Sequence, residues 1–225
     1  KGDRVLDGGC GAGEVAISAA QQGAKAFGSD LTPELIDRAK ENSKISGFDI
    51  NFIVSDVEEL PYDDESFDFV LSQFGHMFAP RPNVAVREMM RVLKTGGVIA
   101  FSTWPPELLT GRLFALTAKY GPPLPEDLPS PVEWGDVEEI KKRIGDLAKH
   151  ISFHRAQYGN PAMSPAHMRI LLETHIGPIA AVIKYLEDSP NKQSLFRSEI
   201  DVLLGEYFEN NTVIQSYLMT RGIKR

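Results

Sequence analysis

The chain has 225 residues, of which 42% are hydrophobic and 24% are charged, proportions that exclude a disordered chain, a collagen-like repeat and a coiled coil. Twenty-four lysines and arginines stand against 31 aspartates and glutamates, and the net charge of −7 disfavours binding to nucleic-acid phosphates. No run approaches the ~18 apolar residues of a membrane span, and no signal sequence is recognisable. The single cysteine, Cys10, is typical of a reducing compartment. We therefore expect a cytoplasmic protein without stable membrane insertion.

The first hundred residues alternate short apolar strands with helices. Thr32 is expected to cap the second helix and Gly47 to end it, while Thr95-Gly96-Gly97 is expected to separate the third helix from the fifth strand. Strands separated by helices predict a parallel α/β sheet. The expected strands are residues 4–7, 24–30, 52–54, 67–72 and 98–102, and the expected helices are residues 14–22, 33–46 and 82–93.

The second half of the chain has a different pattern. Seven of the 15 prolines fall within residues 105–131, which predicts a surface connection with a short helix near residues 108–119. The helices before the last strand are too long for a simple connection, and such insertions often carry substrate sites. The remaining expected elements are a helix at 136–149, a sixth strand at 151–158, helices over 165–208 with breaks near Gly177-Pro178 and Ser189-Pro190, and a last strand at 213–220.

A glycine-rich run, Asp7-Gly8-Gly9-Cys10-Gly11-Ala12-Gly13, joins the first strand to the first helix. Glycine allows a sharp turn and a close approach to a ligand, beside a helix N-terminus that favours negative charge. Gly11, Gly13 and Ala16 match the loose dinucleotide pattern, with Asp30 at the distance that NAD binding requires. Asp7 opposes that interpretation, because a carboxylate lies badly beside a pyrophosphate and suits an ammonium group instead.

Acids follow three of the expected parallel strands. Asp7, Asp30 and Asp56 each lie at the C-terminal end of such a strand, where open α/β sheets bind their ligands. The alternative is that Asp30 and Asp56 only cap the helices that follow them. Thr32 is the better cap beside Asp30, which favours the ligand interpretation.

The run from Val5 to Gly13 resembles the first motif of class I S-adenosylmethionine-dependent methyltransferases. Gly28-Ser29-Asp30-Leu31-Thr32-Pro33 resembles the second motif, whose acid binds the ribose hydroxyls. Ser55-Asp56-Val57 resembles the third, whose acid meets the adenine amino group. Residues 67–74 and 91–97 resemble the fourth strand and the turn before the fifth. The match covers residues 4–102 and is closest to the branch of quinone C-methyltransferases and small-molecule methyltransferases.

The resemblance implies a Rossmann-like sheet of seven mostly parallel strands, with helices on both faces and a helical cover between the last two strands. It implies one methyltransferase domain over residues 1–225, with a cofactor-binding half at 1–103. The substrate-side half, 104–225, contains the helical insertion at about residues 164–209. The implied cofactor is S-adenosylmethionine, converted to S-adenosylhomocysteine, and its expected contacts are Asp7, Gly8, Gly9, Gly11, Gly13, Asp30, Leu31, Asp56, Val57, Gln73 and Phe74.

The implied activity is methyl transfer to a small hydrophobic acceptor, with no nucleic-acid partner. Two alternatives are a non-catalytic S-adenosylmethionine-binding regulator and a nicotinamide-dependent oxidoreductase. The sequence predicts neither the acceptor nor the oligomeric state. The chain enters its first strand after Lys1-Gly2-Asp3, so we expect natural residues upstream.

His76 is the candidate general base, because it follows the fourth strand and an unperturbed histidine has a pKa near 6.5. The alternative is that His76 only packs beside the cofactor. His150 and His154 lie around the expected sixth strand, where four residues span ~13 Å, so we expect no metal site there.

Overall fold

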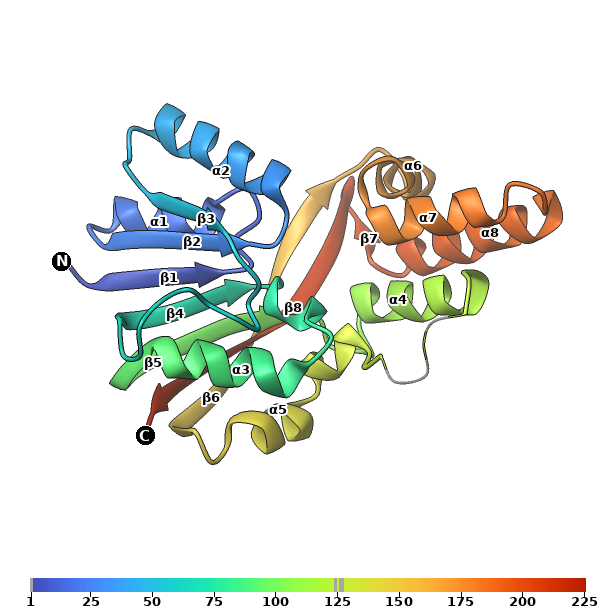
Figure 1. The fold of residues 1–225 in the computed structure, drawn as a ribbon. Coiled ribbons are helices and arrows are strands. Elements are labelled where there is room, and N and C mark those ends of the chain that lie inside the picture. Colours follow the sequence, from blue (N-terminus) through green and yellow to red (C-terminus); the bar gives the residue numbers. More distant parts are fainter. Residues whose placement is uncertain (1, 124, 126–127) are drawn as a thin grey trace. The chain divides into compact units, whose positions relative to one another are not determined.

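The computed structural model describes residues 2–123, 125 and 128–225. Figure 1 follows the chain through its helices and strands. The chain divides into two compact units. The first unit contains Lys1–Thr103, Glu133–His154 and Leu218–Arg225, and the second contains Trp104–Val132 and Arg155–Tyr217.

The first unit begins with the expected alternation of strands and helices. Helix α1 packs against β1 and β2, whereas α3 packs against β4 and β5. The elements are β1 (Arg4–Gly8), α1 (Glu14–Gln21), β2 (Lys25–Asp30), α2 (Pro33–Ser46), β3 (Asn51–Val54), β4 (Phe67–Gln73), the 3-10 helix η1 (His76–Phe78), α3 (Pro82–Val92) and β5 (Leu93–Thr103).

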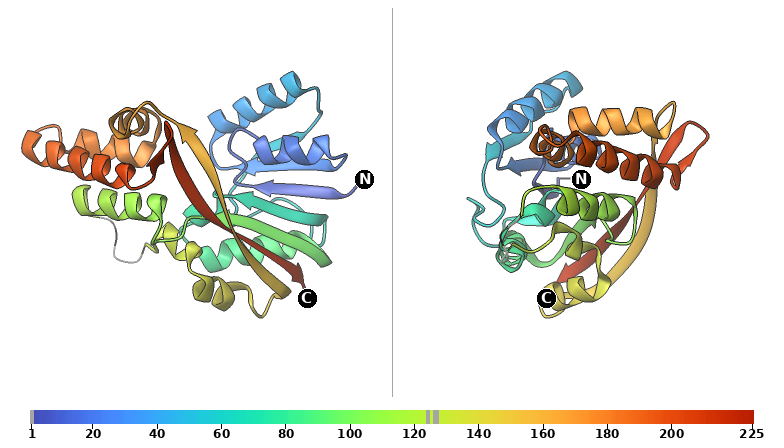
Figure 2. Two further views of the ribbon diagram at one scale, coloured as in Figure 1. Left: turned by 180° about the vertical axis from the view of Figure 1, so that it is seen from behind. Right: turned by 90° about the vertical axis from the view of Figure 1, so that its right-hand side faces the viewer.

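One mixed sheet contains all the strands of the described chain, in the order β3-β2-β1-β4-β5-β8-β6. The pairs from β3 to β5 are parallel, and β5 pairs antiparallel with β8 (Thr212–Lys224). Strand β6 (Ala148–Pro161) is the neighbour of β8, and Figure 2 shows both as long strands. The predicted mostly parallel α/β sheet is therefore confirmed. An eighth strand, β7 (Phe208–Glu209), is a two-residue addition paired with β8.

The predicted separation of the third helix from the fifth strand is wrong. Helix α3 ends at Val92 and β5 begins directly at Leu93. Phe67 pairs with Leu93, and the next paired residues are Phe69 and Val98, so Thr95-Gly96-Gly97 lies in a bulge of β5. Gly96 adopts a positive φ of 78° there.

The connection from β5 to β6 contains helices in both units. Helix α4 (Leu109–Tyr120) belongs to the second unit, and α5 (Val137–Ile144) to the first. Asp136 caps α5 by accepting hydrogen bonds from the Glu138 and Glu139 amides. Helix α5 is shorter than predicted, because the chain has already entered β6 at Ala148. The 3-10 helix η2 (Pro131–Gly135) precedes α5.

Three helices lie between β6 and β8 in the sequence, as predicted for the insertion. They are α6 (Pro165–His175), α7 (Gly177–Tyr185) and α8 (Pro190–Gly205). The predicted breaks at Gly177-Pro178 and Ser189-Pro190 are confirmed, since a proline opens α7 and another opens α8. These helices and α4 enclose the core of the second unit around Phe196, Ile200 and Leu204. No helix within the described residues has the length and apolar character needed to cross a membrane.

Candidate functional site

The turn between β1 and α1 has the left-handed backbone that its glycines permit. Gly9, Gly11 and Gly13 have φ values of 68°, 53° and 91°. A Cβ added to Gly13 would lie 2.9 Å from the Phe52 ring, so the absence of a side chain there permits packing against β3. Nothing lies within 4 Å of a Cβ added to Gly11, so this part of the turn faces open space. Gly11 thus leaves its backbone accessible to a ligand.

Asp7 is a buried carboxylate at the end of β1, only 1% exposed. Its Oδ2 accepts a hydrogen bond from the Ala16 amide at 3.2 Å, while Oδ1 has no partner among the described residues. Burial, together with the nearby Glu14 and Asp30 carboxylates, raises the pKa of Asp7 to about 7. An unpartnered buried carboxylate oxygen is costly, and a cation satisfies it best.

Asp30, at the end of β2, connects two turns. Its Oδ2 accepts a hydrogen bond from the Gly11 amide, and its Oδ1 accepts one from the Thr32 amide, both at 2.9 Å. Thr32 is the N-cap residue of α2 as expected, but its side chain makes no capping hydrogen bond. Leu31 beside it is 66% exposed, which leaves an apolar surface next to the carboxylate.

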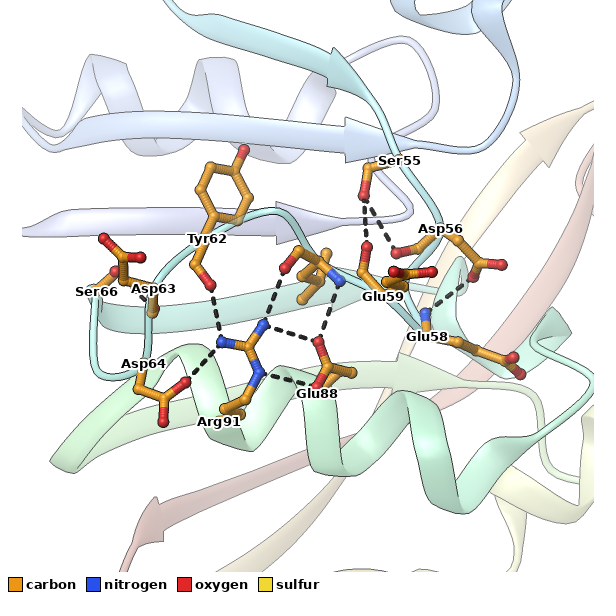
Figure 3. Close-up of polar contacts among 11 residues, drawn as sticks. Ser55, Asp56, Glu58, Glu59, Tyr62, Asp63, Asp64, Ser66, Glu88 and Arg91 are labelled. Carbon is orange, nitrogen blue, oxygen red and sulfur yellow. Dashed lines mark hydrogen bonds and ion pairs between the residues drawn. The ribbon is translucent and has the colours of Figure 1, made fainter.

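Asp56 follows β3 and accepts a hydrogen bond from the Glu58 amide at 2.9 Å (Figure 3). The Ser55 amide donates to the Asp30 carbonyl at 2.9 Å, which ties the residues after β3 to the end of β2. Val57 lies beside the Gly8 backbone, because a Cβ added to Gly8 would be 3.6 Å from Val57 Cγ2. Residues from the first three strands are thus held at one edge of the sheet.

A charged network holds the loop that leads from Asp56 to β4. The Arg91 guanidinium donates to Glu88, to Asp64 and to the Leu60 and Tyr62 carbonyls, as Figure 3 shows. Within the acidic run Asp63-Asp64-Glu65, Glu65 also accepts hydrogen bonds from Thr95. Asp64 and Glu65 thereby connect the loop to Arg91 of α3 and Thr95 of β5.

Two contacts at the end of β4 were not anticipated from the sequence. The Ser72 hydroxyl donates to the Gly8 carbonyl at 2.6 Å and accepts from the His76 amide at 3.1 Å. A Cβ added to Gly75 would lie 2.3 Å from the Gly9 carbonyl oxygen, so the β1 and β4 turns touch through their backbones. The only sequence signal was the small size of these residues. Gln73 is exposed, and Phe74 adopts a positive φ of 63°.

His76 is enclosed by aromatic rings rather than directed at open space. Its ring centroid lies 4.7 Å from those of Phe101 and Trp134, and the residue is 1% exposed. Neither ring nitrogen has a hydrogen-bond partner among the described residues. Burial, together with the nearby positive charge of Arg143, lowers the pKa of His76 to about 3. This environment favours the packing alternative over the general base.

Comparisons with known proteins identify the family. Residues 6–101 match the family model described as a methyltransferase domain. The uncharacterized protein Rv1403c of Mycobacterium tuberculosis is 34% identical over 223 residues, which cover 97% of this chain and 80% of that protein. The demethylmenaquinone methyltransferase of Clavibacter sepedonicus is 34% identical over 122 residues, 52% of this chain and 49% of that protein.

Solved structures share the fold. The YcgJ protein of Bacillus subtilis superposes with a TM-score of 0.64 at 20% identity, covering 100% of this chain and 92% of that chain. Phosphoethanolamine N-methyltransferase 2 of Haemonchus contortus, solved with S-adenosylhomocysteine, has a TM-score of 0.59 at 20% identity. The superposition covers 100% of this chain and 49% of that chain.

The chain belongs to the class I S-adenosylmethionine-dependent methyltransferases. It is an enzyme of this type, and S-adenosylmethionine is its cofactor. Membership sets aside the dinucleotide interpretation of Gly11, Gly13 and Ala16. The residues of the methyltransferase fit this cofactor, because the unpartnered Oδ1 of Asp7 suits a cationic ligand and the Gly11 turn faces open space.

Proposed function

We propose that this methyltransferase transfers the methyl group to a small, mainly apolar acceptor. Two relatives support this class. One is the demethylmenaquinone methyltransferase named above, and the other is the ubiquinone biosynthesis O-methyltransferase of Coxiella burnetii, 34% identical over 103 residues, 46% of this chain and 44% of that protein. The net charge of −7 also disfavours polyanionic acceptors.

The observation that carries the cofactor assignment is the group of three carboxylates around the β1 turn. Asp7, Glu14 and Asp30 lie close enough for the latter two to raise the pKa of Asp7. None of the three forms an ion pair with another described residue. S-adenosylmethionine brings an ammonium and a sulfonium, both cations, to such a site. Its binding there relieves the repulsion between the carboxylates.

Each proposed contact uses one feature of these residues. Asp7 holds the ammonium, the Gly11 turn lies along the amino-acid portion, and Asp30 accepts hydrogen bonds from the ribose hydroxyls. Asp56 accepts from the adenine amino group, and the exposed side chain of Leu31 lies against the adenine ring. The remaining proposed contacts are Gly8, Gly9, Gly13, Val57, Gln73 and Phe74.

The cofactor supplies an electrophilic methyl group on a positively charged sulfur. Because that charge is lost in the transition state, the protein contributes mainly by placing the acceptor in line with the methyl group. His76 is a poor proton acceptor near neutral pH, since burial lowers its pKa to about 3. We propose that it packs against Phe101 and Trp134, and that positioning supplies the catalysis. The insertion at residues 164–209 is proposed to cover the acceptor.

The test is methyl transfer by the purified chain from labelled S-adenosylmethionine to a panel of quinols, phenols and small amines. The expected result is formation of S-adenosylhomocysteine with one or more quinols or phenols, and none with the amines. Turnover of a polar amine alone would contradict the proposed acceptor class and leave the cofactor assignment intact.

A further inference from the structure

The second unit contains a small apolar pocket of its own. Its walls are the side chains of Leu113 and Phe114 from α4, Leu172 from α6, Ile176 and Ile179. Pro178 and three uncharged polar residues complete the lining. No ionisable side chain lines the pocket in the described parts of the chain. A charged ligand would lose its hydration there without a compensating charge, so the pocket suits a neutral molecule.

A chain of hydrogen bonds leads into this pocket from β6. The Asn160 amide nitrogen donates to Gln215 Oε1 at 3.0 Å. Gln215 in turn donates through Nε2 to the Thr110 hydroxyl oxygen. Both Gln215 and Thr110 line the pocket. In this arrangement the Gln215 amide directs its oxygen to Asn160 and its nitrogen to Thr110.

This series of hydrogen bonds ends at the Thr110 hydroxyl, whose proton has no acceptor among the described residues. Thr110 Oγ1 accepts from Gln215, and no described residue accepts a hydrogen bond from Thr110 in return. The other threonine of the pocket differs, since Thr117 donates its proton to the Phe114 carbonyl at 2.8 Å. Hydrogen bonds in series polarise one another, so the half-buried Thr110 hydroxyl is a strengthened donor beside the apolar residues of the pocket.

We infer that this pocket binds the methyl acceptor, and that the acceptor is a neutral apolar molecule carrying an oxygen that accepts a hydrogen bond from Thr110. The inference rests on the proposed function and adds to it the acceptor's chemistry and the residue that selects it. The apolar walls hold the carbon skeleton. Thr110 is half-buried, and a bound hydrocarbon would cover its hydroxyl proton without accepting it, whereas a carbonyl or phenolic oxygen would accept it.

The experiment measures direct binding of two matched probes, 1-tetralone and tetralin, to the full chain. The two have the same fused-ring skeleton, and only 1-tetralone carries a carbonyl oxygen. The wild-type protein is expected to bind 1-tetralone more tightly than tetralin. Thr110→Val should weaken 1-tetralone binding about 3- to 10-fold and leave tetralin binding unchanged. Thr110→Ser, which keeps the hydroxyl, should bind like the wild type.

Thr174→Val is the matched control. Thr174 is exposed on α6, donates to the Ile170 carbonyl at 2.8 Å and lies outside the pocket, so its loss should change neither probe's affinity. Unchanged tetralin affinity shows that the Thr110 variant keeps its pocket. The inference is overturned if Thr110→Val binds 1-tetralone as tightly as the wild type, if the wild type binds both probes equally, or if it binds neither.

A parallel titration with S-adenosylmethionine separates this inference from the proposed function. All proposed cofactor contacts lie in the first unit, so Thr110→Val should bind the cofactor with wild-type affinity. If the protein binds S-adenosylmethionine but neither 1-tetralone nor tetralin, the pocket assignment is overturned and the cofactor assignment stands. Thr110-dependent probe binding by a protein that transfers no methyl group to any quinol or phenol overturns the proposed acceptor class and supports the pocket.

Discussion

Asp7 has the most unusual environment of the proposed contacts, because burial raises its pKa to about 7. Asp7→Asn keeps an oxygen for the Ala16 amide and removes the charge. We expect this variant to bind S-adenosylmethionine about 10- to 100-fold more weakly, the range for hydrogen bonds to charged groups. Calorimetry measures the affinity, and wild-type affinity in a folded Asp7→Asn protein would rule out the ammonium contact.

The same substitution should stabilise the protein without cofactor. The folded pKa of Asp7 lies above the ordinary value of 3.8, so the unfolded chain loses this proton first as pH rises. The free energy of unfolding therefore decreases between pH 4 and 7, by at most about 4 kcal/mol. Asp7→Asn avoids this loss, and its melting temperature should exceed the wild type's at pH 8 by a margin that shrinks toward pH 4.

Asp30 is expected to contribute to S-adenosylmethionine affinity in two ways, by direct contact and by holding the Gly11 turn. Asp30→Ala removes the acceptor for the Gly11 amide and the proposed acceptor for the ribose hydroxyls. We expect S-adenosylmethionine binding to weaken by about 1.5–3 kcal/mol. Asp37→Ala is the matched control, since Asp37 is an exposed acid on α2, and its affinity should not change. Equal affinities in the two variants would exclude the Asp30 contact.

His76 should affect acid stability and leave the chemical step unchanged. Its folded pKa of about 3 lies below the ordinary 6.5, so the unfolded chain takes up a proton first as pH falls. The stability is complete above pH 6.5 and decreases below it, by at most about 5 kcal/mol. His76→Gln should lose less melting temperature between pH 7 and pH 5 than the wild type does.

The rate measurement tests the base directly. At saturating cofactor and acceptor, His76→Gln should keep most of its turnover and the wild-type pH profile. Loss of about 100-fold or more in rate, together with loss of the acid limb, would instead establish His76 as the base. His175→Gln, at an exposed position on α6, serves as the control for a histidine substitution.

At the scale of elements, the β1 and β4 turns depend on each other through Gly9 and Gly75. A methyl group on Gly75 would lie 2.3 Å from the Gly9 carbonyl oxygen and 2.7 Å from its Cα, and both are backbone atoms. Gly75→Ala must therefore push the two turns apart. We expect a loss of about 1–3 kcal/mol in the free energy of unfolding, as for overpacking, and weaker cofactor binding.

Gly205→Ala is the comparison for this substitution. Gly205 ends α8, and nothing lies within 4 Å of a Cβ added there. Alanine at that position should be neutral or slightly stabilising. Urea unfolding of both variants measures the difference, and equal stabilities would show that the two turns can separate without cost.

At the scale of the whole molecule, the two units have separate cores and separate proposed roles. Phe196 is fully buried in the second unit, while Asp7, Asp30 and Asp56 lie in the first. Phe196→Ala should cost about 3–5 kcal/mol of stability. Below its melting temperature it should bind S-adenosylmethionine normally and turn over the acceptor poorly. Leu195→Ala, at the neighbouring exposed position, should change neither property.

Most of the fold could be predicted because its signals are local. The apolar strands, the glycine run and the prolines that open α7 and α8 each act over a few residues. The start of β5 could not be predicted in this way. Leu93 joins that strand because it pairs with Phe67, 26 residues earlier in the chain, and the intervening Thr95-Gly96-Gly97 is accommodated as a bulge.

The sequence by itself determined the order of strands and helices, the glycine turn and the acids at three strand ends, since each depends on neighbouring residues and on the rule that parallel strands end at one edge. Only the tertiary structure decided how those groups behave. Ser72 reaches the Gly8 carbonyl across 64 positions, Gly75 touches Gly9, and His76 is enclosed by Phe101 and Trp134. Burial and hydrogen-bond partners come from residues distant in the chain, and they decide whether a titratable side chain binds, packs or reacts.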